Sequence, residues 1–170
     1  MAIVATLDAG LVAASRGATI IQLRMRGATT RELESSAGRL VREAGLPVLI
    51  SRRIDVAVAA GAAGVNLPED DLPVAAARRL LGPAALVGRS VHDLSGALAA
   101  EASGASFVLF GPVFATPSHP DAPAAGLDAL SAVARTLTIP VLAVGGVLSD
   151  RVAAVLGAGA AGHAAIRAYS

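Results

Sequence analysis

The segment TIPVLAVGGVLSD, residues 138–150, contains the pattern that decides the fold. Thr138-Ile139-Pro140 ends a helix-compatible stretch, because proline cannot continue a helix but is tolerated at the first residue of a strand. The short apolar run Val141–Gly145 that follows is typical of a buried strand. Gly145-Gly146 closes this run, and Ser149-Asp150 begin the next helix. The segment therefore predicts a helix, a strand and a second helix in succession.

Junctions of this kind occur seven times along the chain. Each joins a helix-compatible stretch to an apolar run through Gly-Ala, Gly/Thr-x-Pro or, once, Gly-Pro, which are typical helix ends. Apolar runs that alternate with helices indicate a parallel sheet covered by helices, and seven junctions predict strands two to eight of a TIM-barrel-type (β/α)8 fold. The predicted strands are Thr19–Leu23, Val48–Ser51, Gly64–Leu67, Leu86–Ser90, Phe107–Val113, Val141–Gly145 and His163–Ala168.

The predicted barrel is less complete at its ends than in its middle. Strand one is either Ala2–Thr6 or absent, in which case Met1–Arg16 forms one helix. The last predicted strand is followed directly by Ser170, so the eighth helix is missing. We expect a single TIM-barrel-type domain over residues 1–170, shortened at the N-terminus and lacking the last helix. Both missing parts lie where strand eight should meet strand one. We expect an apolar strip there, and this strip predicts a homodimer contact.

Composition excludes several classes of partner. The chain has 14 basic and 13 acidic residues and is 2% aromatic, so it lacks the basic face and stacking rings of a nucleic-acid binder. No apolar run approaches the ~20 residues of a membrane span, and the first residues lack the basic region of a secretory signal. The absence of cysteine fits a cytoplasmic protein.

Active sites of this fold lie at the C-terminal ends of the strands. Period-two alternation places Gln22, Arg24 and Arg26 on one face, where an amide and two guanidinium groups predict phosphate or carboxylate binding. We assign Ser51, which ends the next run, to the same ligand site. We expect Arg53 and Asp55, which follow Ser51, to form an ion pair on the protein surface.

The next two strand ends carry acids and a histidine. The acidic segment Glu69–Asp71 has two interpretations: the three consecutive acids bind Mg²⁺, or Asp71 caps the following helix, and we favour the cap. Ser90 and His92 share one parity and are expected to point into the barrel mouth. His92 is a candidate general acid and base, although it also suits a role in satisfying local backbone groups.

The last strand ends predict a phosphate site. The backbone N–H groups of Gly145-Gly146 suit an anion, and Ile166-Arg167 end the final run beside them. Thr116 and Ser118 offer hydroxyl groups on a proline-rich loop nearby.

Four motifs, in their order and spacing, resemble the thiamine phosphate synthase/TenI family from about Gly17 to the C-terminus. The resemblance implies a TIM-barrel fold and a small-molecule ligand that carries a thiazole phosphate. The motifs are Gln22-Leu23-Arg24, Gly88-Arg89-Ser90-Val91-His92, Phe110–Pro117 and Ala143–Val147.

Departures from the family pattern bear on the activity. The synthases join a hydroxymethylpyrimidine diphosphate to a thiazole phosphate and release diphosphate with Mg²⁺. Their Asn-Asp-Arg after strand three, in which the Asp binds metal, is Ser51-Arg52-Arg53 here, whereas Asp71 matches their second acidic ligand. Their two lysines are replaced by Arg26 and His119. Mg²⁺ is therefore expected only if the chain is a synthase.

The TenI branch aromatises a carboxythiazole phosphate by moving a proton, without metal. Its Gly-Arg-Ser-Val-His motif is intact in Gly88–His92, but its second histidine is Pro112 here. Our first hypothesis is a TenI-like tautomerase in which His92 moves the proton. The alternatives are a thiamine phosphate synthase with an altered metal site and a non-catalytic protein that binds a phosphorylated ligand.

Overall fold

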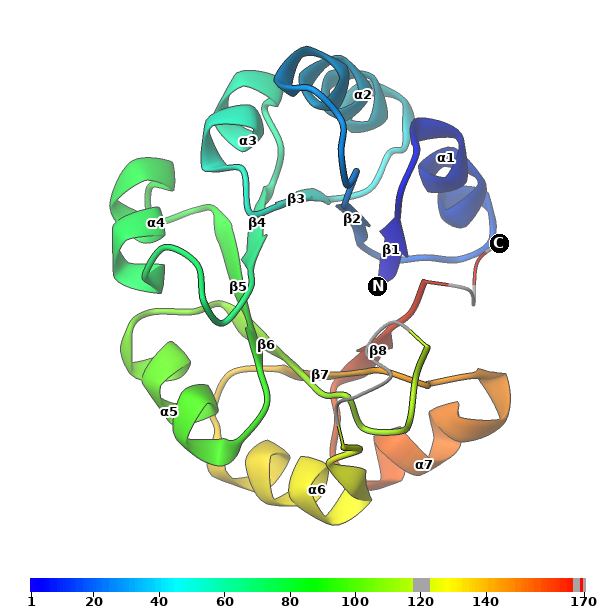
Figure 1. Ribbon diagram of the computed structural model, residues 1–170, viewed down its shortest axis with the longest axis vertical. Helices are drawn as coiled ribbons and strands as arrows, with labels where there is room; N and C mark the ends of the chain where they lie inside the picture. Colours follow the sequence, from blue (N-terminus) through cyan, green and yellow to red (C-terminus); the bar gives the residue numbers. More distant parts are fainter. Residues whose placement is uncertain (118–122, 167–168, 170) are drawn as a thin grey trace.

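Eight parallel strands form a ring, and neighbours in the ring follow the order of the chain (Figure 1). The computed structural model describes residues 1–117, 123–166 and 169. An isolated parallel bridge between Ala2 and Ala165 joins the two ends of the sheet, and the Ile3 N–H donates to the Ala165 carbonyl at 2.9 Å. The TIM-barrel-type fold is confirmed. The strands are β1 (Ala2–Val4), β2 (Ile21–Leu23), β3 (Val48–Ser51), β4 (Gly64–Leu67), β5 (Leu86–Val91), β6 (Phe107–Phe110), β7 (Val141–Val144) and β8 (Gly162–Ala164).

Helices alternate with the strands and cover the outside of the ring (Figure 1). In the described part of the chain no helix follows β8, as expected from the sequence. None of the described helices is long and apolar enough to cross a membrane. The helices are α1 (Leu7–Ser15), α2 (Thr30–Glu43), α3 (Ile54–Ala60), α4 (Val74–Leu81), α5 (Leu94–Ala102), α6 (Gly126–Thr136) and α7 (Val152–Gly157), with a 3-10 turn η1 (Ser149–Arg151) before α7.

The first β/α unit is present, so the interpretation of Met1–Arg16 as one helix is wrong. Thr6 has extended backbone angles, φ −142° and ψ 160°, and its side chain accepts a hydrogen bond from the Ala9 N–H at 3.2 Å. Because an N-cap residue must leave the helical conformation, α1 begins after Thr6. The three residues of β1 are buried, and the strand ends at Val4 rather than at Thr6.

The starts of α2 and α4 differ in whether the local sequence determines them. Thr29 and Glu32 form a capping box at the start of α2, so two residues within its first turn determine where this helix begins. Asp71 does not cap α4, so that expectation is wrong. The helix begins after Pro73, and no side chain caps it, because the Asp71 carboxylate binds elsewhere, as described below.

Two apolar clusters fill the molecule. The larger cluster lies between sheet and helices and includes residues such as Ile21, Leu23 and Leu40. The smaller cluster takes the alternate strand positions, which face the barrel interior, and it includes Leu49, Phe107 and Leu109. The Phe107 ring lies over Gly88, where a Cβ atom would come within 2.2 Å of the ring. Interior packing therefore requires glycine at this position.

We expect Gly88→Ala to destabilise the protein by about 1–3 kcal/mol, because the added methyl group overpacks the barrel interior. Gly157→Ala is the matched control, since a Cβ atom on this residue at the end of α7 meets nothing within 4 Å. The control should be neutral or stabilising by up to about 1 kcal/mol. Urea unfolding of both variants measures the difference, and equal effects would contradict this account of Gly88.

Candidate active site

The C-terminal ends of the strands enclose a cavity of about 730 Å³. A second cavity of about 570 Å³, lined by Arg26, shares Arg24 and Ile166 with the first and extends it past β2. Ser118 and Arg167 lie outside the described residues, and Asp71 does not line either cavity. The structure thus brings most of the predicted site residues together. Those that line the larger cavity are Gln22, Arg24, Ser51, Ser90, His92, Thr116, Gly145, Gly146 and Ile166.

Buried amide groups border this cavity. Gln22 and Asn66 are each only 3% exposed, and the Asn66 Nδ2 donates to Ser90 Oγ at 3.1 Å. Within the described residues, Gln22 Oε1 and Asn66 Oδ1 have no hydrogen-bond partner. Buried acceptors are nearly always paired in native proteins, so these two oxygens fit a ligand that supplies N–H groups. Asn66 was missed at the sequence level, although a single polar residue within the apolar run Gly64–Leu67 was its signal.

His92 is oriented by the main chain. Its Nδ1 lies within hydrogen-bond distance of the Gly111 carbonyl oxygen, and because a carbonyl only accepts, Nδ1 carries the proton. The Nε2 atom lies 3.6 Å from a carboxylate oxygen of Glu69. In the neutral ring Nε2 therefore carries no proton and is available as a base. Both interpretations of His92, backbone partner and proton acceptor, are compatible with this geometry.

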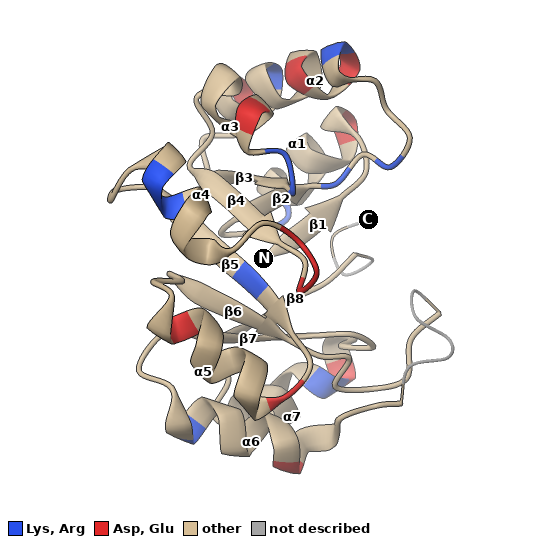
Figure 2. Ribbon diagram, turned by 60° about the vertical axis from the view of Figure 1, so that its left-hand side comes forward, with Lys and Arg blue, Asp and Glu red and all other residues tan. Residues whose placement is uncertain are grey.

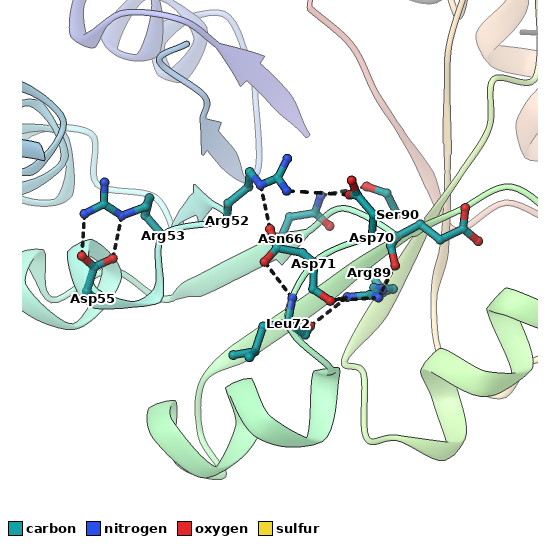
Figure 3. Close-up of polar contacts among 10 residues, drawn as sticks. Arg52, Arg53, Asp55, Asn66, Asp70, Asp71, Leu72, Arg89 and Ser90 are labelled. Atoms are coloured by element: carbon teal, nitrogen blue, oxygen red, sulfur yellow. Dashed lines mark hydrogen bonds and ion pairs between the residues drawn. The ribbon is translucent and has the colours of Figure 1, made fainter. Parts of the chain in front are cut away.

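Arg89 holds the acidic loop that follows β4. Its guanidinium donates to the Leu72 carbonyl at 2.9 Å, and it also contacts the carbonyls of Glu69 and Asp71 (Figure 3). All of these acceptors are main-chain atoms. Arg89 therefore positions the loop beside the cavity.

Arg52 binds the same loop from the end of β3. Its Nε lies 2.7 Å from an oxygen of Asp71, and its Nη2 lies 3.7 Å from Asp70 (Figure 3). The other Asp71 oxygen accepts the Leu72 N–H at 2.7 Å. Arg52 has φ +67°, which makes it the only residue other than glycine with positive φ in the described chain. This conformation is costly for a long side chain, and the ion pair offsets part of the cost.

The residues present do not fit a magnesium site. The resemblance pairs Asp71 with a second carboxylate at position 52, but the partner here is the Arg52 guanidinium. In the described ranges no group of three or more His, Cys, Asp and Glu residues is arranged to hold a metal ion. Mg²⁺ needs oxygen ligands, and a guanidinium beside the carboxylate repels it.

Arg53 points away from the cavity and forms the expected surface ion pair. Its guanidinium binds Asp55 at 2.5 and 2.8 Å (Figure 3). It also contacts the Thr30 hydroxyl group. The contact with Arg53 lowers the pKa of the Asp55 carboxyl to about 2. Arg53 therefore has a structural role.

Three guanidinium groups gather where β2 and β3 end. Burial lowers the pKa of Arg24, and the positive charges of Arg26 and Arg52 lower it further. Over the described ranges, no carboxylate pairs with Arg24 or Arg26. Figure 2 shows these basic segments and the acidic loop after β4 around the same end of the barrel. Unpaired cations next to a cavity favour a bound anion.

A second anion-binding region lies at the end of β7. Gly145 and Gly146 have φ of +90° and +63°, and a Cβ atom on Gly145 would lie 2.6 Å from Pro112. Arg151 donates to the Gly146 carbonyl at 2.9 Å and lies over the Phe114 ring at 4.7 Å. No acceptor in the described chain takes the N–H of Gly145 or Gly146. These donors suit phosphate.

Arg151 was missed at the sequence level. Its position in the turn after Ser149-Asp150 was the available signal.

The family model described as thiamine monophosphate synthase matches residues 4–169. The chain belongs to the thiamine monophosphate synthase family.

Relatives in this family are similar over most of their length. The thiamine-phosphate synthase of Chloroflexus aurantiacus is 44% identical over 168 residues, which cover 96% of this chain and 76% of the relative. The thiamine-phosphate synthase of Anaeromyxobacter dehalogenans is 48% identical over 161 residues, which cover 89% of this chain and 70% of the relative. The solved thiamine phosphate pyrophosphorylase of Pyrococcus furiosus has a TM-score of 0.87 and 34% identity, covering 97% of this chain and 84% of that one.

We expect Gln22→Leu to leave stability unchanged or to raise it by about 1 kcal/mol, because it removes an unpaired buried acceptor at similar volume. Gln22→Ala is the control, and it should lower stability because it leaves a cavity. Thermal unfolding without ligand compares the two variants. If Gln22→Leu destabilises the protein as much as Gln22→Ala does, the amide has a structural partner and is not kept for a ligand.

Proposed function

We propose that the chain is a thiamine phosphate synthase, which transfers a hydroxymethylpyrimidine group from its diphosphate to a thiazole phosphate. The observation that carries the proposal is the presence of two anion-binding regions on one cavity: Gly145-Gly146 after β7, and the arginines after β2 and β3. A synthase binds two phosphorylated substrates, whereas the tautomerase binds one. The names of the relatives also support the synthase.

In the proposed reaction the thiazole phosphate group binds the free N–H groups of Gly145 and Gly146, next to Arg151. The diphosphate group binds the guanidinium groups of Arg24 and Arg52. The bond between the pyrimidine methylene carbon and the diphosphate oxygen breaks, and diphosphate leaves with the electron pair. The thiazole nitrogen donates its lone pair to the same carbon and becomes positively charged. The arginines stabilise the negative charge that develops on the leaving group.

Gln22 and Asn66 lie between these two regions in the proposed complex. Their unpaired amide oxygens are suited to accept N–H groups of the pyrimidine, and Thr116 and Ser51 also line the space around the reactants. Alignment of the carbon between the attacking nitrogen and the leaving oxygen is the main contribution of such contacts.

The tautomerase remains a second candidate because of His92. Its Nε2 is available as a base, and one imidazole near neutral pH can take a proton from a thiazole ring and return it. The intact Gly88–His92 motif does not favour this candidate over the synthase, since its residues have structural partners: Gly88 packs under Phe107, Arg89 holds a loop, and Ser90 binds Asn66.

We expect purified protein to form thiamine phosphate and to release diphosphate from the two synthase substrates. His92→Asn keeps a donor for the Gly111 carbonyl but removes the base, so synthase activity should fall by no more than about tenfold. Alkylation of an aromatic thiazole nitrogen requires no proton removal, which is the reason for this small effect.

The same preparations should be assayed for aromatisation of the carboxythiazole phosphate. Absence of diphosphate release, together with an aromatisation activity that His92→Asn lowers by about 100-fold or more, would establish the tautomerase instead. Absence of both reactions, with thermal stabilisation by thiazole phosphate, would identify a non-catalytic binding protein.

A further inference from the structure

We propose that Arg52 replaces the divalent metal ion in this chain and itself binds the diphosphate group of the pyrimidine substrate. This inference rests on the proposed synthase function and deepens it: the substrate binds as the free diphosphate rather than as a magnesium complex.

One oxygen of Asp71 has a hydrogen-bond partner, whereas the other is buried and, within the described residues, contacts Arg52 as an ion pair without a hydrogen bond. One accepts the main-chain N–H of Leu72 at 2.7 Å, and the other lies 2.7 Å from Arg52 Nε. The Asp71 side chain is 19% exposed, so this ion pair is largely withdrawn from solvent. A metal ion at this carboxylate would have to displace a cation that is covalently part of the protein. The ion pair therefore occupies the position where the family resemblance places the metal.

The backbone of Arg52 directs its side chain to this position. With φ +67°, the residue adopts the left-handed conformation, which favours glycine, asparagine and aspartate over arginine. The Arg52 N–H donates to the Asn66 carbonyl at 3.1 Å, which fixes the residue against the end of β4. The backbone here suits a short polar side chain such as the aspartate of the family pattern.

The Arg52 guanidinium retains donors for a ligand. Only Nε makes the short contact with Asp71, since Nη2 is 3.7 Å from Asp70, whose side chain is 83% exposed. Arg52 also lines the cavity and lies close enough to Arg24 for its charge to lower the pKa of that residue. A planar guanidinium binds two phosphate oxygens at once and keeps its charge at every physiological pH. It can therefore serve diphosphate without a metal ion.

Calorimetric titration with inorganic pyrophosphate tests the proposal on the intact protein. Wild type should bind pyrophosphate in EDTA, and replacing EDTA with Mg²⁺ should not strengthen binding, because Mg²⁺ complexes pyrophosphate in solution and lowers the concentration of the free ligand. Arg52→Asp should bind about tenfold or more weakly in EDTA and regain affinity with Mg²⁺, because it places a second carboxylate beside Asp71. Arg42→Asp, an equal charge change on the exposed face of α2, should bind like wild type.

Arg52→Gly is a second variant that does not depend on a new metal site. Glycine adopts positive φ without strain, so this variant should fold at least as well as wild type and still lose pyrophosphate binding in EDTA by about tenfold. Mn²⁺ titration followed by electron paramagnetic resonance should detect saturable binding to Arg52→Asp with pyrophosphate, and none to wild type.

Two results would overturn the proposal: wild type that binds pyrophosphate only with Mg²⁺, or wild type that binds one Mn²⁺ per chain. A separate readout concerns the synthase function. Metal-independent pyrophosphate binding without any thiamine phosphate formation would refute the synthase while supporting the role of Arg52. Product formation that requires Mg²⁺ would refute the role of Arg52 while supporting the synthase.

Discussion

The space inside the barrel is the constraint on which the other features of this structure depend. The strands are three to six residues long, so each contributes only a few inward-facing side chains. Phe107, Leu49 and Leu109 form the apolar part of the interior, and Phe107 leaves no room for a side chain at Gly88. Inward positions closer to the C-terminal ends carry Gln22, Asn66 and other polar groups. The floor of the cavity is therefore apolar, and its walls can hydrogen-bond a ligand.

Local signals predicted the barrel well because each junction contains the residues that end one element and begin the next. Pro140, Gly145 and the Thr29–Glu32 capping box act on residues within one turn of themselves, so their effects can be predicted without knowledge of the tertiary structure. The third and fourth strands have the predicted bounds. β6 and β7 end earlier than predicted, since Gly111-Pro112 and Gly145 form loops, whereas β5 extends one residue further than predicted, to Val91.

The sequence predicted which residues line the cavity more successfully than it predicted the contacts that these residues make. Alternation along a strand is enough to place Gln22, Arg24 and His92 on the cavity. The contacts of Arg52 and Arg151 depend on loops that approach from other strands, and no local pattern specifies those loops. Asp71 illustrates the difference, because its position before a helix suggested a cap, whereas the long-range contact with Arg52 determines its conformation.

The contacts of Arg89 also bear on how this loop can change in evolution. Among the described residues, its guanidinium binds only the carbonyl groups of Glu69, Asp71 and Leu72, and every amino acid provides such a group. The path of the loop is thereby uncoupled from the identity of its side chains. Substitutions at these positions alter the charge presented at the barrel mouth while the scaffold stays in place. Such a loop can change the charges that it presents to a ligand while its backbone keeps the same path.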